Sequence, residues 1–268
     1  MINGYIFANI YILIFFVFFM KAFILCGGKG ERLMPLTSKI PKPMIQINNK
    51  PILEYLILLC RKHGIKEIFI STSYLPEVIK NYFEDGSKWG VKIKYSIETS
   101  PLGTSGSLNN FREFINETFF VIYGDNLTNL NLSKMLDFHH SKKAMGTLFV
   151  YREPLTDRES TPAIVAVKSD GEIFDIIERP MESDKERLKK ISSDQKYMNS
   201  GIYVLEPEIL NLIPFGVSDF MIDIFRQLMK NKNLFAFRDN PYIREVGIFL
   251  RLNKAREEIE SGEVSLDL

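Results

Sequence analysis

From Ala22 onward, short runs of apolar residues alternate with segments whose apolar residues recur at helical spacing. The runs predict buried strands at 22–26, 67–72, 91–97, 118–125 and 145–151. The segments between them predict helices at 51–65, 76–85, 105–115 and 132–143. Such alternation calls for a parallel, doubly wound sheet whose ligand lies at the carboxyl ends of the strands.

The pattern changes after Tyr151, where residues 162–179 read as two strands joined by a Ser-Asp-Gly turn. The charged segment 181–196 has almost no large apolar residues, which leaves two interpretations: a solvated loop, or a mobile lid over a site. Strands are then expected at 197–205, 234–239 and 242–248, and helices at 207–213, 217–231 and 250–262.

The composition is that of a globular chain: 268 residues, 46% of them hydrophobic, with 34 basic against 33 acidic residues. A net charge of +1 argues against nucleic-acid or membrane-surface binding driven by net charge, but not against a local basic pocket. Cys26 and Cys60 lie in apolar runs without metal-ligand spacing and are expected to be reduced and buried, as in a cytoplasmic enzyme. We expect His63, His139 and His140 on helix surfaces, because they show no metal spacing either.

The first twenty residues are an exception to this composition. Residues 2–20 are almost wholly apolar, barely long enough for a membrane span, and lack a secretory cleavage site. Only Lys21 separates them from the first core strand, so an anchor would hold that edge of the sheet against the bilayer. Because Met20-Lys21 would make an ordinary chain start, we interpret residues 1–20 as an upstream start-site extension and place the working domain at 21–268. An anchor through residues 2–20 is the alternative.

The first strand runs into three glycines, Gly27, Gly28 and Gly30. Glycines here let backbone N–H groups approach a phosphate because no side chain intervenes, although a tight turn alone would also use them. Two known phosphate loops are excluded. Leu33 stands where a dinucleotide-binding loop needs a glycine, and the GxxxxGK of a Walker loop is absent.

Two cations follow the glycines. Arg32 is close enough to fold back on a phosphate held by the loop. Lys42 lies between Pro41 and Pro43, which stiffen the segment, so this lysine loses little freedom when it meets an anion. Fixed positive charge beside backbone donors predicts a site suited to a triphosphate.

The stretch "GGKGERLMPLTSKIPKPM", at 27–44, resembles the signature of the sugar-1-phosphate nucleotidyltransferases, also called NDP-sugar pyrophosphorylases. The resemblance continues in "SPLGTSGSL", "YGDN", "ERP" and "NSGIYVLEPEIL", and covers the chain from Met20 to about Ala255. It implies an α/β, Rossmann-like (GT-A-like) three-layer sandwich with a mixed, mostly parallel central sheet. It also implies nucleotide contacts from Leu25 and the loop glycines.

Asp125 ends the apolar strand at 118–125. An acidic residue at this edge of a parallel sheet, opposite a phosphate loop, is placed to hold a Mg²⁺ that bridges phosphates, although it could instead cap the next helix. The resemblance implies that Asp125 is a magnesium ligand.

Glu98 ends the strand at 91–97 and is followed by a turn that contains Gly103 and Thr104. Such a turn could lay its backbone against a flat base while Glu98 accepts hydrogen bonds from that base, or Thr104 could simply cap its helix. The resemblance implies base contact at Glu98 and Gly103, with Thr104 in the same nucleotide-binding segment.

Glu178 and Arg179 stand at another strand end. The carboxylate could grip sugar hydroxyls and the cation a sugar phosphate, while a surface ion pair is the plainer alternative. The resemblance implies sugar-phosphate binding by Glu178, Arg179, Asn199 and Gly124. Arg179 departs from the family's lysine but keeps the charge.

The clearest departure from the family is at 242–249. Glu245 stands where the family has an aspartate that helps to bind metal, and Ile248 and Phe249 replace a threonine and a proline. Glutamate can ligate Mg²⁺, but its extra methylene moves the carboxylate, and Mg²⁺ tolerates poor octahedral geometry badly. A second-metal role for Glu245 therefore stays open.

The function implied by the resemblance is the formation of an NDP-sugar and pyrophosphate from a nucleoside triphosphate (NTP) and a sugar 1-phosphate. Arg32, Lys42 and Asp125 would be the catalytic residues and Mg²⁺ the cofactor. Guanylyl transfer to a mannose or heptose 1-phosphate and thymidylyl or uridylyl transfer to glucose 1-phosphate both fit. Two alternatives stay open: a catalytically silent, NDP-sugar-binding regulator, and a transferase for a non-sugar phosphate such as phosphocholine. The expected partners are the substrates and no nucleic acid; whether the chain forms a homo-oligomer is left open.

Overall fold

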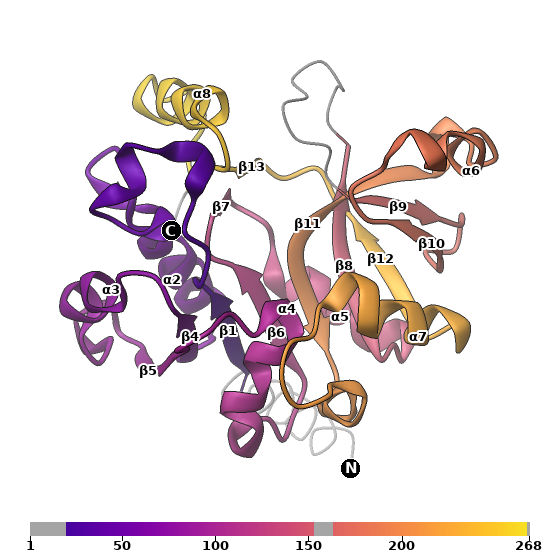
Figure 1. The fold of residues 1–268 in the computed structure, drawn as a ribbon, viewed down its shortest axis with the longest axis horizontal. Helices are drawn as coiled ribbons and strands as arrows, with labels where there is room; N and C mark the ends of the chain where they lie inside the picture. The colour runs from indigo at the N-terminus through magenta and orange to yellow at the C-terminus, as the bar shows by residue number, and fades with distance from the viewer. Residues whose placement is uncertain (1–19, 153–162, 267–268) are drawn as a thin grey trace, which may run out of the picture.

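A mixed sheet of nine strands runs through the molecule in the order β10-β9-β11-β6-β1-β4-β5, with β8 paired to β11 and β12 to β8 (Figure 1). Its strands are β1 (Lys21–Leu25), β4 (Glu67–Thr72), β5 (Lys92–Ile97), β6 (Phe119–Tyr123), β8 (Gly146–Tyr151), β9 (Ile164–Val167), β10 (Ile173–Ile177), β11 (Lys196–Leu205) and β12 (Leu234–Arg238). β1, β4, β5 and β6 pair in parallel, whereas β11 is antiparallel to β6, β8 and β9. Because β12 is parallel to β8 and β10 is antiparallel to β9, seven strands run one way and two the other. The expected mixed, mostly parallel sheet is confirmed.

The structure is a computed structural model that describes residues 20–152 and 163–266. The expectation attached to the apolar run at 2–20 therefore lies outside the described residues, apart from Met20. Within the described ranges, none of the helices has the length and apolar character needed to cross a bilayer.

Helices cover both faces of the sheet. One face packs against α2 (Ile52–Lys62), α3 (Pro76–Phe83) and α5 (Leu132–Lys142). The other packs against η5 (Ser107–Phe114), η8 (Pro207–Leu212), η9 (Phe220–Ile224) and α7 (Phe225–Lys230). Successive residues of β1 serve the two layers: Ala22 and Ile24 face the first, and Phe23 faces the second, where its ring stacks on Phe69 at 4.7 Å. The expected three-layer sandwich follows from this alternation.

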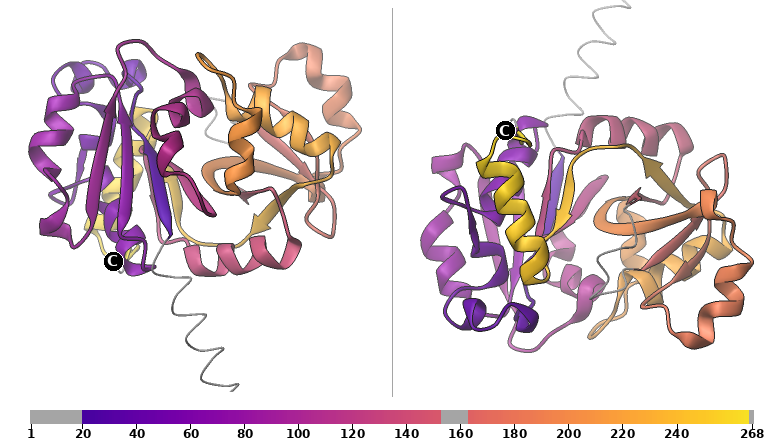
Figure 2. Two further views of the ribbon diagram at one scale, coloured as in Figure 1. Left: turned by 90° about the horizontal axis from the view of Figure 1, so that it is seen from below. Right: turned by 90° about the horizontal axis from the view of Figure 1, so that it is seen from above.

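The C-terminal helix α8 (Phe249–Glu260) returns to the N-terminal half of the chain (Figure 2). Its Leu252 and Ala255 pack in one cluster with Leu33 and Ile45, from the segment that follows the glycines. The short strand β13 (Ile243–Glu245), just before α8, pairs with β7 (Asn126–Thr128), which follows Asp125. Glu245 is thereby brought to the edge of the sheet where β6 ends.

Shorter elements complete the described chain. They are β2 (Gln46–Ile47), β3 (Lys50–Pro51), α4 (Gly103–Gly106), α6 (Lys185–Lys189), and the single turns η1 (Glu31–Leu33), η2 (Leu36–Ser38), η3 (Lys42–Met44), η4 (Ser87–Trp89), η6 (Glu182–Asp184) and η7 (Ser193–Gln195). Two expected helices are each divided: 105–115 into α4 and the 3₁₀ helix η5, and 217–231 into the π-helix η9 and α7.

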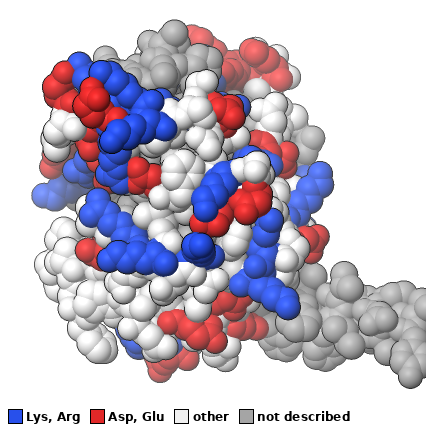
Figure 3. Space-filling model, turned by 90° about the vertical axis from the view of Figure 1, so that its right-hand side faces the viewer, with Lys and Arg blue, Asp and Glu red and all other residues white. Residues whose placement is uncertain are grey.

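The charged segment 181–196 was expected to be irregular, but it forms η6, α6 and η7. Two apolar residues account for this. Ile191 is buried and, with Leu188, packs against Ile164 and Ile177 of the neighbouring hairpin. Figure 3 faces the side of the molecule that carries this segment and shows basic and acidic side chains interspersed there.

His139 corrects an expectation about the histidines. Its side chain is fully buried rather than on the helix surface, because it lies on the stripe of α5 that also buries Leu132 and Met135. Its Nδ1 lies 2.8 Å from the Thr147 hydroxyl, and its Nε2 lies 2.9 Å from Oε1 of Glu206. The imidazole therefore ties α5 to β8 and to the end of β11.

Replacing His139 by leucine should lower the free energy of unfolding by about 1–3 kcal/mol, because it removes both hydrogen bonds of a buried polar group. His140→Leu is the matched control, since this neighbouring ring is exposed and should change stability by less than about 0.5 kcal/mol. Urea unfolding measures both variants. Equal effects would show that the buried bonds contribute nothing.

Candidate active site

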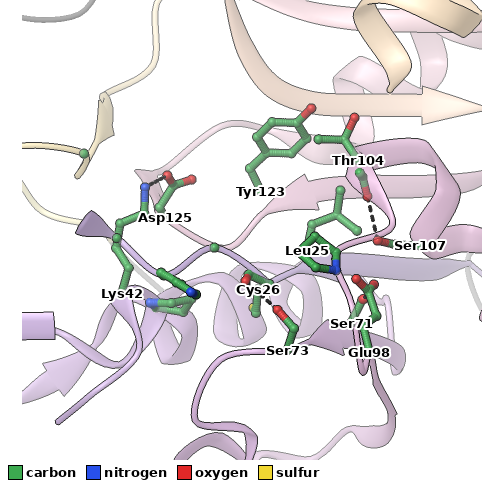
Figure 4. Close-up of a pocket in the computed structure, with 18 of the residues that line it drawn as sticks. Leu25, Cys26, Lys42, Ser71, Ser73, Glu98, Thr104, Ser107, Tyr123 and Asp125 are labelled. Carbon is green, nitrogen blue, oxygen red and sulfur yellow. Dashed lines mark hydrogen bonds and ion pairs between the residues drawn. The ribbon is translucent and has the colours of Figure 1, made fainter. Parts of the chain in front are cut away.

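Two adjoining cavities open at the carboxyl edge of β1, β4, β5 and β6. Figure 4 shows residues that line the larger one. The smaller, of about 260 Å³, is lined by Glu178, Arg179, Asn199 and Glu245. Thr104, Tyr123 and Asp125 line both cavities, so the two meet at these residues. The larger, of about 820 Å³, is lined by ten of the residues expected from the sequence: Leu25, Gly27, Gly28, Gly30, Arg32, Lys42, Glu98, Gly103, Thr104 and Asp125.

Gly124 is the expected site residue that lines neither cavity. Its N–H donates to the Leu25 carbonyl at 2.9 Å. A Cβ here would lie 2.6 Å from the Cys26 sulfur and 3.0 Å from the Leu25 oxygen. Gly124 therefore lets the end of β6 lie directly against the end of β1, and we do not retain it as a sugar-phosphate contact.

The glycine loop is fixed by side chains that bond its backbone. The Ser73 hydroxyl donates to the Gly27 carbonyl at 2.7 Å, and the Thr37 hydroxyl donates to the Gly30 carbonyl at 2.9 Å. Gly30 has a φ of 67°, which favours glycine. A Cβ on Gly28 would meet no atom within 4 Å, so this residue leaves its side of the cavity open.

Lys42 and Asp125 form an ion pair across the larger cavity (Figure 4). Both side chains are only 15% exposed, so the pair is well shielded from water. Arg32 is freer: its side chain is 52% exposed, and its Nη2 lies 3.9 Å from Oε1 of Glu245. Three cations, Lys29, Arg32 and Lys42, therefore line this cavity, and Arg32 is less shielded from an incoming anion than Lys42.

Glu98 lies at the far end of the larger cavity, as a buried carboxylate after β5. Its Oε1 accepts a hydrogen bond from the Ser71 hydroxyl, and its Oε2 accepts one from the Leu102 N–H at 3.2 Å. An ionised carboxylate offers about four acceptor positions, so each oxygen retains a further one.

Thr104 does not cap its own helix, which corrects that alternative; α4 has no side-chain cap. Its hydroxyl instead donates to Oδ2 of Asp219 at 2.9 Å and accepts the Phe220 N–H at 3.0 Å. The side chain therefore points away from its helix and joins α4 to the start of η9.

The smaller cavity gathers the expected sugar-phosphate residues with one that the sequence did not suggest. Arg179 is 89% exposed, with its Nε 3.8 Å from Oε1 of Glu178. Burial, and secondly the charge of Asp219, raises the pKa of Glu178. The Asn199 amide donates to the Tyr203 hydroxyl at 2.9 Å. Asp219 carried no recognisable signal, because an acidic residue before an apolar helix reads as an ordinary cap.

Glu245 is placed beside Asp125 by the backbone: the Val246 N–H donates to the Asp125 carbonyl at 2.9 Å. Burial, and secondly the nearby Asp125, raises the pKa of Glu245. Its Oε2 accepts a hydrogen bond from Nη1 of the buried Arg251 at 3.1 Å. The longer side chain that replaces the family's aspartate is thus held by a cation from α8.

These two carboxylates fit a magnesium ion. The described residues contain no group of three or more His, Cys, Asp or Glu side chains that could hold a metal by itself. Mg²⁺, however, is usually bound through one or two carboxylates together with substrate phosphates and water. Asp125, at the junction of the two cavities, and Glu245, in the lining of the smaller one, match that donor set.

Comparison with known proteins gives a consistent result. The model of the family described as "Nucleotidyl transferase" matches residues 21–261. A D-glycero-alpha-D-manno-heptose 1-phosphate guanylyltransferase of Campylobacter jejuni is 33% identical over 85% of this chain and 95% of its own length. A UTP–glucose-1-phosphate uridylyltransferase of Synechocystis is 36% identical over 78% of this chain. The match covers only 55% of that relative, so the chain spans about half of its length.

Among solved structures, HddC from Yersinia pseudotuberculosis complexed with GMP-PN is similar, with a TM-score of 0.71 and 26% identity. The match covers 90% of this chain and 99% of that one. The arrangement of strands and helices is therefore shared along almost the whole of both chains.

Gly28→Ala should leave the free energy of unfolding within about 0.5 kcal/mol of the wild type, because the new methyl group meets no atom. The methyl would occupy cavity space, so affinity for a nucleoside triphosphate should fall about tenfold, or about 1.4 kcal/mol. Urea unfolding and calorimetric titration separate the two effects.

Gly103→Ala is the contrasting variant. Its φ is 76°, and the new Cβ would lie 2.3 Å from the Ser218 carbonyl oxygen. We expect it to lose about 1–3 kcal/mol of stability.

If Gly28→Ala binds a nucleoside triphosphate as tightly as the wild type, a close approach of phosphate to Gly28 is contradicted.

Proposed function

This chain belongs to the nucleotidyl transferase family, and we propose that it transfers a nucleotidyl group from a nucleoside triphosphate to a sugar 1-phosphate, releasing pyrophosphate. The supporting observation is the junction of two cavities at Thr104, Tyr123 and Asp125. One cavity has a glycine loop and three cations, and the other has carboxylates, two amides and an arginine. We also propose that residues 21–268 form a single nucleotidyltransferase domain.

The reaction needs no protein nucleophile. An oxygen of the sugar phosphate attacks the α-phosphorus in line, a new P–O bond forms, and the bond to the leaving pyrophosphate breaks. Catalysis is then a matter of orientation and charge stabilisation. We assign the backbone of Gly27, Gly28 and Gly30 to the triphosphate.

Charge stabilisation falls to the cations around the junction. Arg32 and Lys42 would neutralise the triphosphate and the pyrophosphate that leaves. In the smaller cavity, Arg179 would hold the phosphate of the acceptor. Glu178 would accept hydrogen bonds from the sugar hydroxyls, and the Asn199 amide would donate to them. The two substrates would thus meet beside Asp125.

The resemblance to this family implies a divalent metal, and we propose Mg²⁺ here. Asp125 would hold it, with Glu245 as a second carboxylate, and the bound ion would supply charge neutralisation between phosphates. The Lys42–Asp125 ion pair orients this carboxylate before the nucleotide arrives. When the triphosphate binds, Lys42 can exchange its ion pair with Asp125 for one with the phosphates.

We propose guanine as the base. Guanine presents two neighbouring N–H donors, N1–H and N2–H, and the retained acceptor positions on the Glu98 carboxylate suit such a pair. Uracil and thymine present one N–H between two carbonyl oxygens, which a carboxylate would repel. Of the two relatives described above, the heptose 1-phosphate guanylyltransferase matches this chain over the larger share of both sequences.

We further propose a cytoplasmic location. Cys26 and Cys60 are buried and free, as expected. Burial, and secondly the charge of Asp125, holds the pKa of the Cys26 thiol far above its usual range. Two buried thiols without a disulfide suit a reducing compartment, where nucleoside triphosphates are also made.

Mixing the enzyme with Mg²⁺, GTP and a mannose or heptose 1-phosphate should release pyrophosphate, measured by a coupled phosphate assay. UTP and dTTP should be poorer donors, by about a hundredfold in kcat/KM. Phosphocholine serves as the non-sugar acceptor control. If no pair of donor and acceptor releases pyrophosphate, while GDP-sugar still binds, the catalytically silent regulator is the better description.

Glu98→Gln tests the base assignment with a side chain of the same shape. The glutamine amide can donate to a pyrimidine carbonyl. The kcat/KM for GTP should therefore fall about tenfold or more, and the kcat/KM values for UTP and dTTP should rise relative to that for GTP. The ratio of GTP to UTP turnover measures this. An unchanged ratio would contradict recognition of the base by Glu98.

A further inference from the structure

Asp219 lines the smaller cavity, and the proposed function leaves it without a role. Its Oδ1 accepts the Met221 N–H at 2.9 Å, and its Oδ2 accepts the Thr104 hydroxyl at 2.9 Å. Each oxygen of an ionised carboxylate can accept about two hydrogen bonds. Asp219 therefore keeps acceptor capacity toward whatever enters the cavity.

The charge of this cavity is unbalanced. Four carboxylates line it in the part of the chain that the structure describes: Asp125, Glu178, Asp219 and Glu245. Among the described residues of its lining, Arg179 is the only cation, and that side chain extends largely into solvent. Asp125 and Glu245 are assigned to the phosphate end. Glu178 and Asp219 remain for the sugar, close enough for the charge of Asp219 to raise the pKa of Glu178.

Asp219 is also held firmly in relation to the larger cavity. The Ser218 carbonyl accepts the N–H groups of Ser105 at 3.1 Å and Gly106 at 3.2 Å, and the Ser218 N–H donates to the Leu102 carbonyl at 2.9 Å. Gly103 leaves no room for a side chain against Ser218. The turn at 102–106, which lines the larger cavity, and the start of η9 thus form one unit, with Thr104 bonded directly to Asp219.

We propose that Asp219 contacts the sugar and, with Glu178, restricts the acceptor to sugars that present hydroxyl donors, so that sugars carrying a carboxylate are rejected. Thr104 is the positioning residue that fixes the Asp219 carboxylate. The assignment rests on the proposed function. Two carboxylates accept charge-assisted hydrogen bonds from sugar hydroxyls. A uronic acid would bring a third negative charge against them, while Arg179, the one cation among the described lining residues, is assigned to the acceptor phosphate. Such like-charge contacts discriminate between ligands.

The test compares matched acceptors, glucose 1-phosphate with glucuronic acid 1-phosphate and mannose 1-phosphate with mannuronic acid 1-phosphate. In the pair that the wild type uses more efficiently, its kcat/KM should be about a hundredfold higher for the neutral sugar than for the uronic acid. Asp219→Asn keeps the shape and removes the charge, so it should raise KM for the neutral sugar and reduce this preference about tenfold. A wild type that uses both members equally, or an unchanged preference in the variant, would overturn the proposal.

Thr104 is tested by a pair of variants. Thr104→Val removes the hydrogen bond to Asp219 and should also weaken the preference for the neutral sugar, whereas Thr104→Ser keeps the hydroxyl and should restore it. A merely structural role would lower the melting temperature of Thr104→Val without changing this preference, and that result would overturn the positioning role.

Failure of the proposed function is recognised separately, because the wild type would then release no pyrophosphate with any acceptor. In that event, calorimetric titration of glucose 1-phosphate and mannose 1-phosphate still tests Asp219. We expect about tenfold weaker binding of the preferred one by Asp219→Asn. Equal affinities for both proteins would overturn the contact.

Discussion

The Lys42–Asp125 ion pair lies where two strands that are distant in sequence end side by side. β1 and β6 are parallel neighbours, and the absence of a side chain at Gly124 lets their ends touch. The glycine loop and the acidic residue therefore share one edge, although they are separated by about a hundred residues of chain. The remaining parts of the site, from Arg32 to Glu245, are arranged around this pair.

The two side chains of the pair also balance one another's charge before a substrate binds. A carboxylate and an ammonium that are both largely shielded from water stabilise one another until a stronger partner is offered. A triphosphate attracts the ammonium and a divalent cation attracts the carboxylate. The same two side chains can thus change partners without leaving a buried charge uncompensated, which suits a site that must repeatedly bind and release polyanions. α8 contributes by bringing Arg251 to Glu245, so that the second carboxylate is held too.

The sequence predicted the fold class and the larger cavity well, since alternating strands and helices dictate a sheet edge and the glycines, Lys42 and Asp125 lie in one recognisable signature. It was weaker where position depends on packing between distant segments. Thr104 reads as a helix cap, yet it bonds Asp219, more than a hundred residues away. His139 reads as a surface histidine, because the stripe of α5 that is buried is decided by the sheet beneath it. Leu188 and Ile191 pack against the neighbouring hairpin and order the segment 181–196, but two apolar residues among many charged ones give no clear pattern in the sequence.

The most direct measurement is the affinity for GTP of the wild type and of Asp125→Asn, each titrated with and without Mg²⁺. If Asp125 holds both Lys42 and the metal, Mg²⁺ should strengthen binding to the wild type about tenfold and leave the variant unchanged. Without metal, the variant should bind at least as tightly as the wild type, because its Lys42 is released to the phosphates. Equal strengthening of both proteins by Mg²⁺ would contradict a magnesium site at Asp125 and, with it, the arrangement around that residue.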